Sequence, residues 1–149
     1  MEKEKKLLLA YATMTGNTEE LAEIVYDQLC TQLKEYEVEK YYIDFFKAPQ
    51  VFDVDKYEAV FLGTYTWGQG FSPEEVDQFI TVNDLRKTTV YLFGTGDIQF
   101  GEDLYCLALD KAYQYYGSPR APLKIEQSPR GEQESKVIEW TNKIIEEMS

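Results

Sequence analysis

The chain has 149 residues, of which 44% are hydrophobic, and its 15 basic and 27 acidic residues give a formal net charge of −12. That charge makes nucleic acid and anionic membrane surfaces poor partners and favours proteins with basic surfaces. The chain contains no histidine, so the commonest general base and the commonest zinc ligand are both missing.

Strand-like and helix-like segments alternate along the whole chain. An apolar run predicts a buried strand at 6–13, and apolar residues at helical spacing predict a helix at 17–35. Further strands are predicted at 38–43, 59–64, 88–94 and 121–126. Further helices are predicted at 73–82, 102–116 and 132–148, with one short helical turn in the connection 45–57. Ser72 is expected as the N-cap before Pro73 at the first helical position, and Gly117 is expected to end its helix.

The order of these segments predicts an α/β protein with a single domain, residues 1–149. Near-continuous apolar strands joined by helices are typical of a parallel sheet covered by helices on both faces, a three-layer sandwich. Ligands of such sheets bind beyond the carboxyl ends of the strands. Seven of the nine glycines lie at or just past those ends, where backbone can approach a ligand closely. They are Gly16, Gly63, Gly68, Gly70, Gly94, Gly96 and Gly101.

The cysteine content indicates a reducing compartment. Cys30 and Cys106 lie far apart in the sequence and form no metal or redox motif, so we expect reduced thiols. We expect no signal peptide, and no apolar run is long enough to cross a membrane. The expectation is a cytoplasmic monomer that binds neither membrane nor nucleic acid.

The loop after the first predicted strand offers neutral donors to an anion. It comprises Thr13, Met14, Thr15, Gly16, Asn17 and Thr18 and leads directly into a helix. Hydroxyls and N–H groups at a helix N-terminus favour a phosphate. No lysine or arginine lies between Leu7 and Leu33, which argues against nucleoside triphosphate chemistry and suits a phosphate that is bound without reacting. The alternative is an ordinary strand-to-helix turn.

Two later loops each carry an aromatic residue just past a strand end. Trp67 follows the strand 59–64, and Phe100 follows the strand 88–94. The two rings could sandwich a flat heterocycle, and the peptide at Gly68 could turn its carbonyl toward or away from a ligand. The alternatives are that Trp67 caps the core and that Phe100 packs under the helix that follows it.

Taken together, the three loops resemble those of flavodoxins, small electron carriers that bind flavin mononucleotide (FMN), and the resemblance covers essentially the whole chain. Its most specific motif is 13–18, which resembles the family's phosphate loop. Segments 66–68 and 94–97 resemble the two loops that hold the flavin ring. The resemblance implies a flavodoxin-like five-stranded parallel sheet of order 2-1-3-4-5. Because 123–131 carries no long insertion, it implies the short-chain, bacterial type.

The resemblance also implies a role for each matching residue. Trp67 would stack on the inner face of the flavin, with Thr66 beside the ribityl chain. The Gly68 carbonyl would accept a hydrogen bond from flavin N5 in the one-electron-reduced state. The backbone at Asp97, and residues near Cys106, would contact the pyrimidine edge. The phosphate would be held by Thr13, Thr15, Asn17 and Thr18 with amides of their loop, including Met14 and Gly16. The remaining members of the expected site are Thr64, Tyr65, Gly94, Thr95 and Gly96.

The chain departs from the family pattern at the outer face of the flavin. The family usually places a tyrosine there, whereas the matching residue here is Phe100. The stretch between Asp97 and Cys106 is also longer than the pattern. We favour Phe100 as the outer ring, with Tyr105 or no aromatic residue as the alternatives. Tyr65 stands where a small residue is common.

The function implied by the resemblance is low-potential, one-electron transport. The flavin would cycle between semiquinone and hydroquinone, and the protein would supply no catalytic acid, base or nucleophile. Residues 58–84 include five acidic residues and no basic one, and residues 88–110 include four acidic residues and no basic one. Such charges disfavour the anionic, fully reduced flavin. They also steer the protein to basic docking surfaces. The implied donor is a flavodoxin/ferredoxin–NADP reductase. The implied acceptors are a cytochrome P450, a nitric oxide synthase or a ribonucleotide reductase activation system.

Other functions use the same architecture. An FMN-dependent oxidoreductase such as a quinone reductase needs a substrate pocket over the flavin, for which this chain leaves little room. A flavodoxin-like ribonucleotide reductase activator tends to be shorter, with a less acidic rim. A phosphate-switched receiver needs acidic residues at the end of the first strand, and 11–13 has none. A cofactor-free interaction domain would leave Trp67 and the clustered glycines unexplained.

Overall fold

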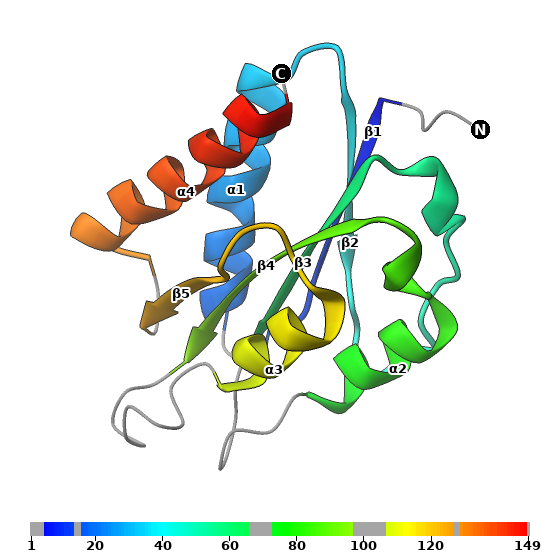
Figure 1. Cartoon of the computed structure of the whole chain (residues 1–149). Helices are drawn as coiled ribbons and strands as arrows, with labels where there is room; N and C mark the ends of the chain where they lie inside the picture. The colour runs from blue at the N-terminus through cyan, green and yellow to red at the C-terminus, as the bar shows by residue number, and fades with distance from the viewer. Residues whose placement is uncertain (1–4, 14–15, 66–72, 97–106, 127–128, 149) are drawn as a thin grey trace.

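The computed structural model is a five-stranded parallel sheet with helices on both faces (Figure 1). It describes residues 5–13, 16–65, 73–96, 107–126 and 129–148. The strand order is β2-β1-β3-β4-β5, and each neighbouring pair is parallel. This arrangement confirms the predicted fold class and the strand order implied by the resemblance.

The elements follow one another in the predicted order. The strands are β1 (Lys6–Tyr11), β2 (Glu37–Tyr42), β3 (Ala59–Tyr65), β4 (Thr89–Gly96) and β5 (Leu123–Glu126). The helices are α1 (Asn17–Gln32), α2 (Glu74–Val82), α3 (Leu107–Tyr116) and α4 (Glu132–Met148), with short 3₁₀ helices η1 (Val54–Lys56) and η2 (Leu85–Lys87). The helical turn expected in the connection 45–57 is η1. Within the described ranges, no helix has the length and hydropathy that crossing a bilayer requires.

Alternation along the strands divides the core into two layers. On β1, Leu7 and Leu9 point to one face of the sheet, whereas Leu8 and Ala10 point to the other, because successive side chains of a strand alternate. All four are fully buried. The sequence therefore shows no polar alternation here, as expected for a parallel strand that is covered on both sides.

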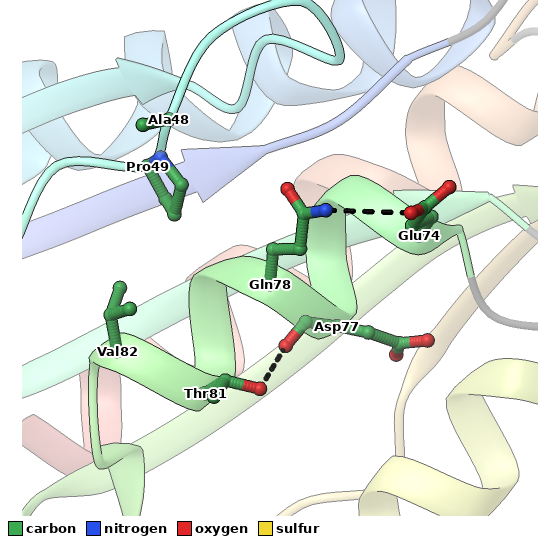
Figure 2. A pocket seen from close by; sticks show the side chains of 7 residues that line it. All are labelled: Ala48, Pro49, Glu74, Asp77, Gln78, Thr81 and Val82. Atoms are coloured by element: carbon green, nitrogen blue, oxygen red, sulfur yellow. Dashed lines mark hydrogen bonds between the residues drawn. The ribbon is translucent and has the colours of Figure 1, made fainter.

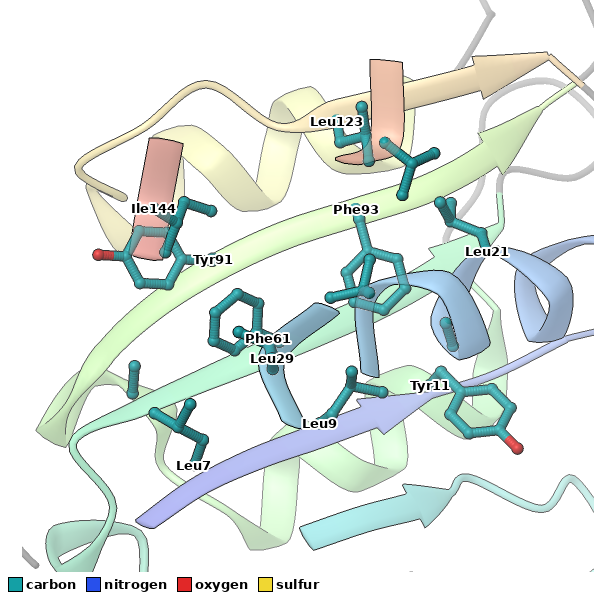
Figure 3. Close-up of a cluster of buried hydrophobic side chains, with 14 of the residues drawn as sticks. Leu7, Leu9, Tyr11, Leu21, Leu29, Phe61, Tyr91, Phe93, Leu123 and Ile144 are labelled. Atoms are coloured by element: carbon teal, nitrogen blue, oxygen red, sulfur yellow. The ribbon is translucent and has the colours of Figure 1, made fainter. Parts of the chain in front are cut away.

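Helices α1 and α4 cover the first face (Figure 3). Phe61 and Phe93 lie in this layer with no exposed surface, and burying a ring of this size stabilises the fold by about 2–3 kcal/mol. The ring of Trp140 on α4 packs edge-on against both, with centroid distances of 6.3 and 6.4 Å. The helical residues buried against this face are Leu21, Ala22, Val25, Leu29, Val137 and Ile144.

Helices α2 and α3 cover the second face. Val76 and Phe79 of α2 and Leu109 of α3 pack on the even-numbered residues of β1 and on their counterparts in β3 and β4. The connections close the rim of this layer with buried apolar side chains. These are Ile43, Val54, Tyr57 and Leu85.

The strand order reverses at β1. The chain leaves β1 to form β2 on one side of it, and later returns to form β3 on the other side. At the carboxyl end of β1, Tyr11 is paired with Tyr42 of β2 and with Gly63 of β3. In parallel sheets such a reversal leaves a crevice beyond the strand ends, and the first two predicted binding loops start there.

Two helix boundaries differ from the prediction. Helix α1 ends at Gln32 rather than at residue 35, because Leu33 leaves the helical region (φ −112°, ψ 68°). Helix α2 begins at Glu74, and Pro73 occupies the cap position with an extended ψ of 141°. The expectation of Pro73 at the first helical position was therefore wrong by one residue, and Ser72, the expected cap, lies outside the described residues.

The remaining boundaries have local causes. Strand β5 begins at Leu123, since Pro122 has no N–H to donate to a ladder. Helix α3 is described from Leu107, so its expected start at 102 lies outside the described residues. Its end at Tyr116 is confirmed, and Gly117 follows with a φ of 58°, which is the backbone conformation that favours glycine after a helix.

Candidate functional site

The predicted binding loops leave the sheet at a single edge, where β1, β3 and β4 end. Because the three strands are parallel and adjacent, their carboxyl ends lie side by side. The described parts of the loops are Thr13 and Gly16–Thr18 after β1, Thr64 and Tyr65 at the end of β3, and Gly94–Gly96 at the end of β4. The other expected site residues lie outside the described residues. They are Met14, Thr15, Thr66, Trp67, Gly68, Asp97, Phe100, Cys106 and the alternative Tyr105.

A glycine shapes the start of α1. Gly16 occupies the cap position with a φ of 93°, and its N–H donates to Oγ1 of Thr13 at 2.9 Å. Its carbonyl accepts the first helical bond, from the N–H of Glu20 at 3.0 Å. Glycine has no side chain to accept from the N–H groups of Thr18 and Glu19, and the first N–H groups of a helix point out of its end. This geometry suits an anion bound by neutral donors.

Three expected site residues meet beneath this edge as a buried hydroxyl cluster, Thr18, Thr64 and Thr95. They are 1%, 3% and 4% exposed. Oγ1 of Thr18 lies 2.7 Å from Oγ1 of Thr95 and 3.4 Å from the carbonyl oxygen of Thr64. The Thr18 hydroxyl has one proton, so when it donates to the Thr64 carbonyl it accepts from Thr95. The cluster thus ties the first turn of α1 to the ends of β3 and β4.

Two glycines let the ends of β3 and β4 pack closely. A Cβ at Gly94 would lie 2.3 Å from the carbonyl oxygen of Thr64 and 3.1 Å from Cδ1 of Leu109. A Cβ at Gly63 would lie 2.3 Å from the buried ring of Phe93. The first of these contacts is with backbone, which cannot rotate away, so only glycine fits at position 94 without displacing the edge.

The same edge is acidic. The hydroxyl of Tyr65 donates to Oε2 of Glu75 at 2.9 Å, and Glu75 is only 5% exposed. Burial and then this hydrogen bond raise the pKa of Tyr65 well above its usual range. Burial also raises the pKa of Tyr42, followed by the charges of Asp44, Glu75 and Glu19. Carboxylates from α1, α2 and the segment after β2 therefore act on one region.

The fold also brings a cation to the start of α1. Nη2 of Arg130, just before α4, lies 3.7 Å from Oε1 of Glu20 in the first turn of α1. Both side chains are well exposed, so the pair contributes little stability. Sequence reasoning did not find this arginine, because the stretch around the loop contains no basic residue and Arg130 comes from the other end of the chain. Arg130 comes near the loop only through the tertiary structure.

Comparisons with known proteins decide the family. The family model described as Flavodoxin matches residues 9–115. The chain belongs to the flavodoxin family. Over 147 residues it is 35% identical to a probable flavodoxin 2 of Bacillus subtilis (strain 168), covering 91% of each chain. The crystal structure of oxidised flavodoxin 1 from Bacillus cereus superposes on this chain with a TM-score of 0.79 at 26% identity, over 97% of this chain and 99% of that one.

A further solved structure is a Fusobacterium nucleatum flavodoxin bound to flavin mononucleotide. It shares the fold of this chain with a TM-score of 0.64 at 16% identity, over 95% of this chain and 98% of that one.

As a flavodoxin, the chain is an FMN-binding electron carrier rather than an enzyme. The described residues fit this cofactor. The start of α1 presents Thr13 and outward-facing N–H groups without a lysine, which suits a phosphate monoester that is held and not transferred. The strand order reverses at β1, and sheets of this kind bind their cofactors beyond the strand ends at such a reversal.

Proposed function

We propose that the chain is a low-potential one-electron carrier that takes electrons from a flavodoxin/ferredoxin–NADP reductase. Its acceptors would be proteins with basic docking surfaces: a cytochrome P450, a nitric oxide synthase or a ribonucleotide reductase activation system. The observation that supports this most is the acidic edge beside the binding loops, where Glu19, Asp44 and Glu75 all act on Tyr42. The proposal places the chain in the cytoplasm, because the free thiol of Cys30 suits a reducing compartment.

The loops would divide the work of holding FMN. Thr13, Thr15, Asn17 and Thr18, with amides of their loop, would bind the phosphate. Trp67 would stack on the inner face of the flavin and Phe100 on the outer face. The Gly68 carbonyl would accept a hydrogen bond from the N–H group at flavin N5 after the first electron. The flavin supplies the redox chemistry, and these groups position it and shield it from water.

The acidic edge would set the potential of the second electron. A charge about 10 Å from the flavin in a water-like medium opposes a further negative charge by about 0.4 kcal/mol, which is roughly 20 mV for one electron. Several such charges would lower the potential of the step to the fully reduced flavin by on the order of 100 mV. A hydrogen bond from N5 to Gly68 would favour the one-electron-reduced state. Together, the acidic charges and this hydrogen bond would separate the potentials of the two one-electron steps.

Stepwise anaerobic reduction of the FMN-loaded protein, followed by its visible spectrum, tests the proposal. We expect near-stoichiometric FMN, quenched flavin fluorescence and a long-wavelength band of one-electron-reduced flavin at intermediate reduction. Direct two-electron bleaching without that band would contradict the carrier and favour an FMN-dependent oxidoreductase. A potential no lower than that of free FMN, with rapid reaction with oxygen, would favour the ribonucleotide reductase activator.

A comparison of FMN with riboflavin tests the phosphate assignment. Thr13→Ala should weaken FMN binding about tenfold, one lost charge-assisted hydrogen bond, and leave riboflavin binding unchanged, because riboflavin has no phosphate. Trp67→Ala is the matched variant for the ring and should weaken both ligands alike. Equal losses for both ligands in Thr13→Ala would contradict a phosphate role.

A further inference from the structure

The edge of the sheet where β1, β3 and β4 end is called the cofactor edge below. A groove lies outside this edge, between the segment after β2 and the outer side of α2. It has a volume of about 380 Å³ and is lined on one side by Ala48 and Pro49. Figure 2 shows these two residues facing α2, with Gln78 and Val82 across the gap. Neither the fold nor the binding of FMN requires an open apolar groove at this place.

The segment that contributes Ala48 and Pro49 to the groove carries further exposed apolar side chains. Phe45 is 55% exposed, Phe46 90% and Val51 69%, and on the opposite wall Val82 is 43% exposed. The rings of Phe45 and Phe46 pack edge-on, with centroids 5.2 Å apart, so they form one surface rather than two separate side chains. A cluster of this kind on a small acidic protein marks a surface that another molecule covers.

The rim of the groove is acidic. Glu74 and Asp77 line it from α2, and Asp44 immediately precedes Phe45. Within the described ranges, no lysine or arginine forms an ion pair with any of these three carboxylates. The surface therefore complements an apolar side chain flanked by cations.

The groove adjoins the cofactor edge. Strand β2 ends at Tyr42, and Glu74 begins α2 at the side of the sheet where the loops after β1 and β3 start. The charges of both Asp44 and Glu75, the neighbour of Glu74, act on the hydroxyl of Tyr42. A protein held at the Glu74 end of the groove is therefore held beside the loops proposed to bind FMN, whereas the Val82 end lies toward the opposite end of the sheet.

We propose that this groove, with Phe45, Phe46, Asp77 and Val82, docks a segment of the redox partner that carries an apolar side chain flanked by lysine or arginine. The inference rests on the proposed function, since it takes the partner to be a redox protein. Charge disfavours a second copy of this chain as the occupant, because a self-complementary contact would bring the carboxylates of Glu74 and Asp77 together. The docked segment orients the partner, while the wider acidic surface steers its approach.

Calorimetric titration of the oxidised holoprotein with a purified ferredoxin–NADP reductase tests the proposal. Phe46→Ser should raise the Kd at least fivefold, and Val82→Thr, which keeps the shape of the side chain, at least twofold. Asp77→Asn should raise the Kd about threefold and reduce its dependence on salt. Phe46 and Val82 carry no charge, so their variants should leave the salt dependence unchanged.

Matched controls come from other surfaces. Tyr115→Ser removes an exposed ring from α3, 62% exposed, and Glu134→Gln removes an exposed carboxylate from α4, on the opposite face of the sheet. Both should bind the reductase within twofold of the wild type. The proposal is overturned if the Phe46→Ser and Asp77→Asn variants bind the reductase as tightly as these controls do. It is also overturned if the wild type sediments as a dimer and Phe46→Ser abolishes that dimer.

The FMN content of each sample, measured by absorbance, reports on the proposed function separately. A protein without FMN would refute the carrier. A protein with full FMN whose groove variants bind the reductase normally would refute only the groove.

Discussion

Two buried polar sites lie at opposite ends of the sheet, and their hydrogen bonds are made in different ways. Asn83, which follows α2 on the side where β3 and β4 begin, is 1% exposed. Its Oδ1 accepts from the N–H of Phe52 at 2.7 Å, and its Nδ2 donates to the carbonyls of Gln50 and Phe79 at 2.9 and 3.1 Å. One side-chain amide thus binds a loop to a helix through backbone groups alone.

The hydroxyl cluster of Thr18, Thr64 and Thr95 lies at the other end. Its shortest contact joins two hydroxyls, Thr18 and Thr95, and either can donate to the other. A hydroxyl rotates to suit its surroundings, whereas the amide of Asn83 has fixed donors and an acceptor that are all engaged. The amino end of the sheet is therefore fixed by its polar contacts, whereas the two hydroxyls at the carboxyl end can exchange the roles of donor and acceptor.

The largest effect tests how tightly the carboxyl end is packed. Gly94→Ala should lower the free energy of unfolding by about 3 kcal/mol, because its Cβ would overlap the backbone carbonyl of Thr64. Urea unfolding followed by circular dichroism measures the change. Gly131→Ala is the control, since it has a φ of 59° and open space around its Cβ and should lose only about 1 kcal/mol. Equal losses would mean that the edge yields easily.

Removing the amide at the amino end should have the next largest effect. Asn83→Ala leaves the N–H of Phe52 and two carbonyls without their side-chain partner, which lowers the free energy of unfolding by about 2 kcal/mol. The FMN Kd, measured by fluorescence titration, should stay within twofold of the wild type, because Asn83 lies far from the binding loops. A tenfold weaker Kd would show that the two ends are coupled.

A smaller effect separates the two roles open to Thr18. Thr18→Val keeps the shape and removes the hydroxyl, and should lower the free energy of unfolding by about 1 kcal/mol. Combined with Thr95→Val in a double-mutant cycle, it should show coupling, since the hydroxyls contact each other. If Thr18 also binds the phosphate, FMN binding weakens in Thr18→Val and not in Thr95→Val. Additive stabilities in the cycle would contradict the hydrogen bond.

The smallest effect concerns alkaline pH at the amino end, near which α3 ends. Burial raises the pKa of Tyr116 to about 12, above the value of about 10 in an unfolded chain. The stabilisation is complete below pH 10 and is lost as the pH rises toward 12. Tyr116→Phe should remove about 1 kcal/mol of that loss between pH 10 and 12, measured by urea unfolding at each pH. Tyr115→Phe, on its exposed neighbour, is the control; an identical slope in both variants would refute the assignment.

The sequence predicted the elements well because the fold is regular. Apolar runs such as 59–64 mark strands that are buried on both faces, and apolar spacing marks the helices. The expectation at Pro73 was wrong because proline at a helix start can adopt an extended ψ as the cap residue, and composition does not distinguish the two positions. The end of α1 was placed three residues late, since buried, apolar Leu33 continues the helical pattern of the sequence while its backbone leaves the helical region.

The site was predicted less completely, since its contacts are tertiary. The loop 13–18 and Gly94 could be found from local patterns. The contact of Thr18 with Thr95 depends on strand order, and that of Tyr65 with Glu75 depends on how α2 packs back on β3, and residue types alone encode neither. The exposed pair Phe45 and Phe46 did carry a local signal, two aromatic residues in a connection outside any strand or helix, which sequence reasoning passed over.

The hydroxyl contact between Thr18 and Thr95 joins positions 77 residues apart in the sequence. Closing so long a loop is unfavourable until the intervening strand β3 has docked between β1 and β4. The cofactor edge is therefore complete only when the central sheet is assembled, and we expect a partly folded chain not to bind FMN. We expect FMN to slow unfolding without accelerating folding, because binding stabilises the native state after the transition state has been crossed.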